Sequence, residues 1–150
     1  MILKLEQNAA QKDIEVILKY PVRNKTVERL VSFVNSFNTK IEGYKDDNIK
    51  QINVPDIYFI ESSDKIAIVF CKEESYKTKY RLYQINEKIK RFGFVQISKY
   101  CLLNINKLDK IKPLTNRRME AILTNGKRLF ITRKYLYDIK RELQEIIDEI

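Results

Sequence analysis

The side chains best suited to chemistry in this 150-residue chain are lysines and arginines, and they are concentrated in one region. Residues 76–141 carry 18 lysines and arginines against 4 acids, a local net charge of +14. Residues 1–75 carry 11 basic and 12 acidic side chains. Cationic groups gathered in this way favour a polyanionic partner such as a nucleic acid. The alternative is a basic surface that serves only solubility.

The patterns expected of an enzyme are missing from the sequence. The chain has no histidine, which removes the commonest general base and the commonest zinc ligand. Neither GxGxxG nor GxxxxGK[ST] occurs, so loops of the kind that cradle nucleotide phosphates are not indicated. The four acids of the basic region are scattered. We therefore expect no enzyme activity, no cofactor, no metal site and no small-molecule substrate.

The two cysteines and the hydropathy pattern indicate a cytoplasmic protein. Cys71 and Cys101 are isolated in the sequence and form no zinc or disulfide pattern, so we expect free, buried thiols. The alternative is a redox-sensitive Cys101, because it lies within the basic region. The N-terminus lacks the apolar core of a secretory signal. No apolar run approaches the roughly 18 residues of a membrane span, so no membrane insertion is expected.

The first 42 residues predict a strand–helix extension. Apolar and polar residues alternate over residues 13–20, which predicts a half-buried strand that ends at Pro21. Asn24 or Thr26 is placed to cap a helix that ends near Asn38. One face of this helix is apolar, at Val27, Leu30, Val31, Val34 and Phe37. That face must pack against the main domain or against a second copy of the chain.

Residues 43–150 predict a mainly β (α+β) domain of stacked short antiparallel sheets with short helices. Asn125-Gly126 is the strongest hairpin signal, since a type I′ turn requires positive φ at both positions. Helices are expected over residues 82–92 and 134–150, and an irregular segment over 98–108. Strands are expected over residues 42–44, 49–54, 56–61, 65–71, 76–80, 94–97, 110–114, 119–124 and 127–132.

Three segments, in this order, resemble the LytTR DNA-binding domain of bacterial transcription regulators. They are VPDIYFIESSDKIAIVF (54–70), FVQISKYCLLNINKLDKI (94–111) and LTNGKRLFITRKYLYDIK (123–140). The resemblance covers about two-thirds of the chain. It implies stacked antiparallel sheets that place loops, and no recognition helix, in successive major grooves of a duplex. It therefore implies a sequence-specific, double-stranded DNA-binding transcription regulator.

The resemblance also implies which loop residues contact DNA. Lys65 is the contacting side chain of the first loop. Ser98 and Lys99 match the family's His/Ser–Arg/Lys pair in the second loop. Arg133 matches the arginine of the [ST]-R-x-Y motif in the third loop, with Lys134 beside it.

This sequence departs from the family pattern near two of those loops. Ile66 and Ala67 stand where a polar residue is frequent, and Gln96 stands where arginine is usual.

The chemistry of these side chains agrees with such roles. The rigid fork of Arg133 can bond guanine O6 and N7 together, and Lys99 can do the same less selectively or bind phosphate. Ser98 and Tyr100 offer hydroxyl groups to phosphate oxygens. Two alternatives remain open: Arg133 as a surface charge paired with an acid of the C-terminal helix (Asp138 or Glu142), and Lys65 as a solvated turn lysine.

Other polar and aromatic residues are interpreted as structural. Asn104 lies between apolar runs, where it can satisfy backbone groups of a turn. Five aromatic residues are placed in the core or on a sheet face, which indicates no stacking platform for single strands: Tyr58, Phe59, Phe70, Phe94 and Phe130.

Members of this family mostly follow a receiver domain, and residues 1–42 are too few for one. The resemblance is closest to short stand-alone regulators. Because such regulators bind paired sites, a homodimer is expected through the N-terminal strand–helix piece. The alternative is that the helix docks on its own β domain. The rival functions are an RNA- or single-strand-binding module and a protein–protein adaptor on the same fold.

Overall fold

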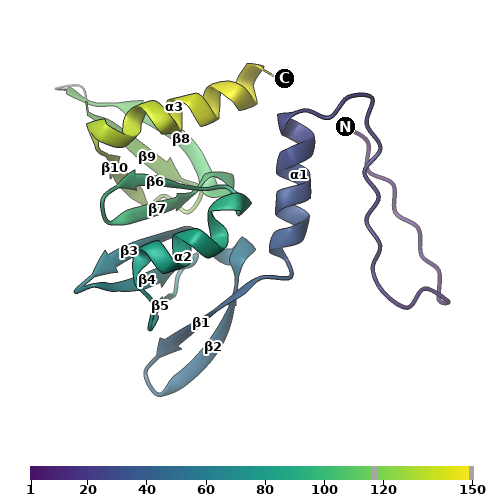
Figure 1. Cartoon of the computed structure of the whole chain (residues 1–150), viewed down its shortest axis with the longest axis horizontal. Coiled ribbons are helices and arrows are strands. Elements are labelled where there is room, and N and C mark those ends of the chain that lie inside the picture. Colours follow the sequence, from purple (N-terminus) through teal and green to yellow (C-terminus); the bar gives the residue numbers. More distant parts are fainter. Residues whose placement is uncertain (116–117, 149–150) are drawn as a thin grey trace.

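A computed structural model describes residues 1–115 and 118–148, and it describes side chains as far as residue 142 and not at 116–117. Within these residues the strands form two antiparallel sheets (Figure 1). The larger sheet has the order β2 (Asn48–Asn53), β1 (Lys40–Lys45), β5 (Ser75–Lys77), β4 (Ile66–Phe70), β3 (Phe59–Ser63), β7 (Cys101–Asn104) and β6 (Phe94–Ser98). The smaller sheet has the order β10 (Arg128–Ile131), β9 (Met119–Leu123) and β8 (Leu108–Pro113).

Helices lie against the sheets, and α2 joins two strands of the larger sheet (Figure 1). The α-helices are α1 (Lys25–Ser36), α2 (Leu82–Ile89) and α3 (Arg133–Asp148). The 3₁₀ turns given bounds in the described chain follow strands or helices: η1 (Val54–Asp56), η2 (Lys90–Phe92) and η3 (Ile105–Lys107). The mainly β, α+β fold class that the sequence predicted is confirmed.

The core has two parts, one on each face of the larger sheet. On one face, Ile85 and Ile89 of α2 pack with side chains such as Ile60 and Leu102. On the other face, Leu103 and Ile97 pack with the smaller sheet and with Ile139 of α3. Strand β7 lies between these two layers, so all four of its residues are buried.

The burial of β7 on both faces corrects the expectation of an irregular segment over residues 98–108. A strand with two buried faces reads as a continuous apolar run and lacks the alternation typical of a half-exposed strand. Asn104, at the end of β7, has the structural role expected of it. Its Nδ2 donates to the carbonyl of Ile57 at 2.8 Å, and its Oδ1 accepts from the backbone N–H of Asn106 at 3.0 Å.

The N-terminal segment also differs from the expectation. Residues 13–20 form no strand, and residues 1–22 run as an extended chain alongside α1 and away from the sheets (Figure 1). Ile14 is 89% exposed and Ile17 is 67% exposed. The alternating pattern is present in the sequence, but a strand needs a hydrogen-bonding neighbour, and this segment has none within the described chain.

Helix α1 forms as predicted and docks on its own domain. The Asn24 side chain caps it by accepting from the N–H of Val27 at 3.0 Å. Val27 is buried, and Arg29 donates to the side chain of Asn106 at 3.2 Å. A second face of the helix stays open, where the rings of Phe33 and Phe37 meet edge to face with their centroids 5.2 Å apart.

The β9–β10 hairpin lies where Asn125-Gly126 predicted it, but its turn is not type I′. Gly126 has φ of +87°, whereas Asn125 is not among the described residues with positive φ. A two-residue turn with positive φ at both positions is found instead between β3 and β4, at Asp64 (φ 51°) and Lys65 (φ 67°).

Both cysteines are free thiols, as expected. Burial is the main cause that raises the pKa of Cys101 to about 12 and that of half-buried Cys71 to about 11. A thiol held neutral in this way is a poor nucleophile. The structure therefore disfavours the redox-sensitive alternative for Cys101.

Candidate nucleic-acid interface

Lys65 lies at the tip of the tight β3–β4 turn, where Ser63 pairs with Ile66. Its left-handed backbone conformation, with φ of 67°, is uncommon for a residue other than glycine. The side chain is exposed, and it has no hydrogen-bond or ion-pair partner among the residues that the structure describes. A cation held in an unfavourable backbone conformation and left unpaired is suited to binding a ligand.

Ser98, Lys99 and Tyr100 form the turn between β6 and β7. The Ser98 hydroxyl accepts from the N–H of Tyr100 at 3.3 Å, and the side chain of Gln96 donates to the carbonyl of Lys99 at 3.3 Å. Gln96 therefore braces this turn where the family usually has arginine. The Lys99 ammonium lies 5.5 Å from the centroid of the Tyr100 ring, so the two side chains extend from the turn next to each other.

Arg133 and Lys134 begin α3 and are both exposed. The preceding residue attaches this end of the helix to the larger sheet, because the N–H of Thr132 donates to the carbonyl of Ile97 at 2.9 Å. Arg133 is consequently held next to the β6–β7 turn. The Lys134 ammonium lies 5.6 Å from the centroid of the Tyr135 ring.

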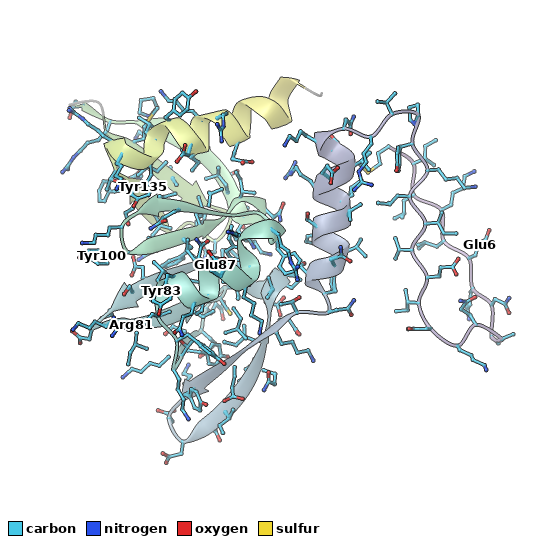
Figure 2. All side chains as sticks on the ribbon, viewed as in Figure 1. Glu6, Arg81, Tyr83, Glu87, Tyr100 and Tyr135 are labelled. Atoms are coloured by element: carbon cyan, nitrogen blue, oxygen red, sulfur yellow. The ribbon has the colours of Figure 1, made fainter. Side chains whose placement is uncertain are left out.

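These three segments lie side by side at one edge of the molecule, which is called the basic edge below. The N–H of Ser62 donates to the carbonyl of Tyr100 at 2.8 Å, so the β3–β4 and β6–β7 turns are neighbours. The link from Thr132 to Ile97 adds the start of α3 on the other side of β6. Figure 2 shows Tyr100 and Tyr135 on this same side. All six residues predicted as contacts from the sequence therefore come together.

The basic edge has two more members that sequence reasoning missed. Arg118 and Phe130 line a hollow together with Ile131, Thr132 and Arg133. The Arg118 guanidinium carbon lies 6.0 Å from the centroid of the Phe130 ring. Phe130 is 60% exposed, so of the two placements expected for it, core or sheet face, it takes the sheet face, and that face is open to solvent. The signal was present in β10, where Leu129 and Ile131 alternate with it and are the buried positions.

The described residues contain no group of three or more acidic or cysteine side chains placed to hold a metal ion. None of the helices described is long and apolar enough to cross a membrane.

Comparison with known proteins identifies the family. The profile of the LytTr DNA-binding domain matches residues 47–144. The chain is 28% identical to the sensory transduction protein LytT of Enterococcus faecalis over 98 residues, which are 65% of this chain and 40% of that protein. It is 26% identical to an uncharacterized HTH-type transcriptional regulator of Staphylococcus aureus over 145 residues, which are 95% of this chain and 98% of that one.

A solved structure has the same fold. The LytTr DNA-binding domain of a Bacillus cereus methyl-accepting/DNA response regulator superimposes with a TM-score of 0.66 at 19% identity. The match covers 71% of this chain and 97% of that one. The structural match shows the fold, and the profile match, which spans more than half of the chain, shows that the chain belongs to the LytTR family. It is a DNA-binding protein of the transcription-regulator class.

Proposed function

We propose that this chain regulates transcription by binding specific sequences in double-stranded DNA with the turns of the basic edge. The observation that carries the proposal is the convergence of two turns, the start of α3 and the neighbouring Arg118 on one edge of the fold. Together they bring five cationic side chains to this edge: Lys65, Lys99, Arg118, Arg133 and Lys134. Turns that project from a rigid sheet can enter a major groove, which admits an element as wide as a helix.

The side chains of the basic edge take different roles in this proposal. Arg133 reads a base, because its planar fork fits O6 and N7 of guanine. Lys99 binds either a base edge or a phosphate. Ser98 and Tyr100 donate hydroxyl hydrogens to phosphate oxygens, and Lys65 and Lys134 contribute charge to phosphate binding.

Selection of bound duplexes from a random-sequence pool tests this function directly. We expect a defined sequence to be enriched. The enriched duplex should then outcompete both single-stranded DNA and structured RNA. Preferential binding of RNA would overturn the proposal in favour of an RNA-binding module. Failure to enrich any sequence would overturn the sequence-specific reading.

We further propose that the chain acts in the cytoplasm as a homodimer on paired sites, with residues 1–42 as the dimerising extension and 43–150 as the DNA-binding domain. Support comes from the apolar side chains that this extension leaves open to solvent. They include Phe33 and Phe37 of α1 and, in the extended segment, Met1, Ile2, Leu3, Leu5, Ile14, Val16, Ile17, Tyr20 and Val22. Strand β1 runs across the proposed boundary, so the two parts are structurally continuous.

A further inference from the structure

The connection between β5 and α2, residues 78–81, lies along the β3–β4 turn on the side away from the β6–β7 turn. The N–H of Thr78 donates to the carbonyl of Ala67 at 3.1 Å, and the N–H of Ala67 donates to the carbonyl of Tyr80 at 2.8 Å. The connection therefore continues the antiparallel pairing of β4 and β5 beyond the end of β5. It places the side chains of residues 78–81 at the same end of the sheet as Lys65.

The backbone of this connection is fixed. Thr78 is buried, and its hydroxyl donates to the carbonyl of Ala67 at 2.8 Å while accepting from the N–H of Tyr80 at 3.1 Å. The N–H of Arg81 donates to the side chain of Gln84 at 2.9 Å, which caps the start of α2. Lys79, Tyr80 and Arg81 are exposed on this rigid backbone.

The two cations of the connection are not neutralised within the described part of the chain. The Lys79 ammonium lies 4.9 Å from the centroid of the Tyr44 ring and makes no ion pair there. The Glu42 carboxylate, which contacts the same Tyr44 side chain, accepts hydrogen bonds from Tyr44 and Gln51. Arg81 uses its backbone N–H for the cap, and its guanidinium has no hydrogen-bond or ion-pair partner among the described residues.

Backbone hydrogen bonds place this connection in line with the basic edge. Four segments are joined in the order α3 start, β6–β7 turn, β3–β4 turn and β5–α2 connection. The joining N–H to carbonyl bonds run from Thr132 to Ile97, from Ser62 to Tyr100 and from Ala67 to Tyr80. From β6 to β5 the sheet has four inter-strand gaps, or about 19 Å at ~4.8 Å each. That length matches about 6 base pairs at the ~3.4 Å rise of each DNA strand. Figure 2 shows Arg81 and Tyr83 on the same side as Tyr100 and Tyr135.

Charge and composition are alike along this line. Residues 63–66, 78–81, 98–100 and 132–135 together contain six lysines and arginines and one acid, Asp64. Three of the four segments contain a Lys-Tyr pair: Lys79-Tyr80, Lys99-Tyr100 and Lys134-Tyr135. An ammonium beside a phenol hydroxyl can bond neighbouring phosphate oxygens, whatever the base sequence.

We propose that the β5–α2 connection is a fourth DNA contact, in which Arg81 and Lys79 bind backbone phosphates of base pairs flanking the recognised sequence. The inference rests on the proposed function, since it assumes that the basic edge meets a duplex. The contact adds affinity and fixes the register of the protein on the duplex, and it leaves base preference to the other turns.

The test compares Arg81→Gln and Lys79→Gln with Lys72→Gln in the full chain. Lys72 is an exposed lysine in the β4–β5 turn, at the opposite end of the same strands, so its substitution removes the same charge away from the basic edge. Binding to a random-sequence duplex of about 30 base pairs is measured against salt concentration. Each test variant should reduce the steepness of the log–log slope by about 0.9, and Lys72→Gln should leave it unchanged.

Phosphate ethylation interference on the selected duplex locates the contact. Ethylation of particular flanking phosphates should block DNA binding by the wild-type chain. Ethylation of the same phosphates should have no effect on DNA binding by the Arg81→Gln variant. If both test variants behave like Lys72→Gln while Arg133→Ala still impairs binding, this inference is wrong and the proposed function stands. If the wild-type chain binds no duplex, both fail together. Because only the backbone of Arg81 takes part in the cap, glutamine should preserve the fold, which circular dichroism verifies.

Discussion

Arg133 and Lys134 are adjacent exposed cations at the start of α3, and they are expected to separate base reading from phosphate binding. Arg133→Ala should cost about 1–3 kcal/mol on the selected duplex and relax preference at one base pair, because a bidentate contact to guanine is lost. Lys134→Ala should weaken binding to the selected and the random duplex by the same factor. Titrations with the selected and the random duplex measure the ratio of the two affinities for each variant. An unchanged ratio for Arg133→Ala would exclude its base-reading role.

Lys65 combines a left-handed backbone with an unpaired charge, so its contributions to folding and to binding can be separated. Asparagine tolerates this backbone conformation better than lysine does. Lys65→Asn should therefore keep the free energy of unfolding the same or raise it by up to about 1 kcal/mol. It should also weaken duplex binding and flatten the salt dependence. Denaturant titration and duplex titration measure the two effects, and unaltered binding would identify Lys65 as a solvated turn lysine.

At the scale of elements, Asn104 joins the end of β7 to the segment between η1 and β3. Its side chain is buried and makes two hydrogen bonds, one to the carbonyl of Ile57 and one from the N–H of Asn106. Asn104→Ala should lower the free energy of unfolding by about 2–4 kcal/mol, because the carbonyl of Ile57 and the N–H of Asn106 would both lose their hydrogen-bond partner. Urea denaturation measures this loss. A change below about 0.5 kcal/mol would show that water replaces the amide.

Elements with local signals were predictable from the sequence, and elements defined by distant partners were not. Helix α1 carries its own cap at Asn24 and its own apolar spacing, so its bounds were predicted closely. Strand β7 was missed because layers from both ends of the sequence bury it, which removes the alternating pattern. Residues 13–20 show that pattern and lack the partner that would make it a strand.

The candidate site also has a part that the sequence predicted and a part that it did not. The types and loop positions of Lys65, Lys99 and Arg133 were readable from the resemblance to the family. Their convergence depends on hydrogen bonds between residues far apart in the chain, such as Thr132 to Ile97, and no local pattern encodes these. Arg118 was missed for the same reason, since Phe130 and Arg133 become its neighbours only when the smaller sheet folds.

At the scale of the whole molecule, the basic edge should make duplex binding strongly dependent on salt. If about 5–8 phosphates are neutralised, the log–log slope of affinity against salt should be about −4.5 to −7, at ~0.9 per phosphate. Fluorescence anisotropy at several salt concentrations gives this slope. A nearly flat dependence would mean that the basic region, with its local net charge of +14, does not face the duplex.

The N-terminal extension is expected to control the assembly of the chain into a dimer. Within the described part of the chain, the hydrogen bonds of residues 1–22 are short-range, such as Gln11 to Asn8. Their apolar side chains are exposed, as are Phe33 and Phe37 of α1. A second copy can cover both surfaces at once, and a symmetric pair is the commonest closed assembly. We therefore expect the full chain to dimerise at tens of micromolar, and deletion of residues 1–22 to give a monomer.

Sedimentation of the two forms, with and without a duplex carrying two selected sites, measures this difference. Because the deleted segment lies outside both core clusters, the shortened chain should keep its thermal midpoint and its affinity for a single site. It should lose affinity only for the two-site duplex, where linkage raises the effective concentration of the second domain. Phe37→Gln, on the open face of α1, should weaken the dimer in the same direction. A full chain that stays monomeric on and off the two-site duplex would mean that docking on its own domain is the whole role of α1.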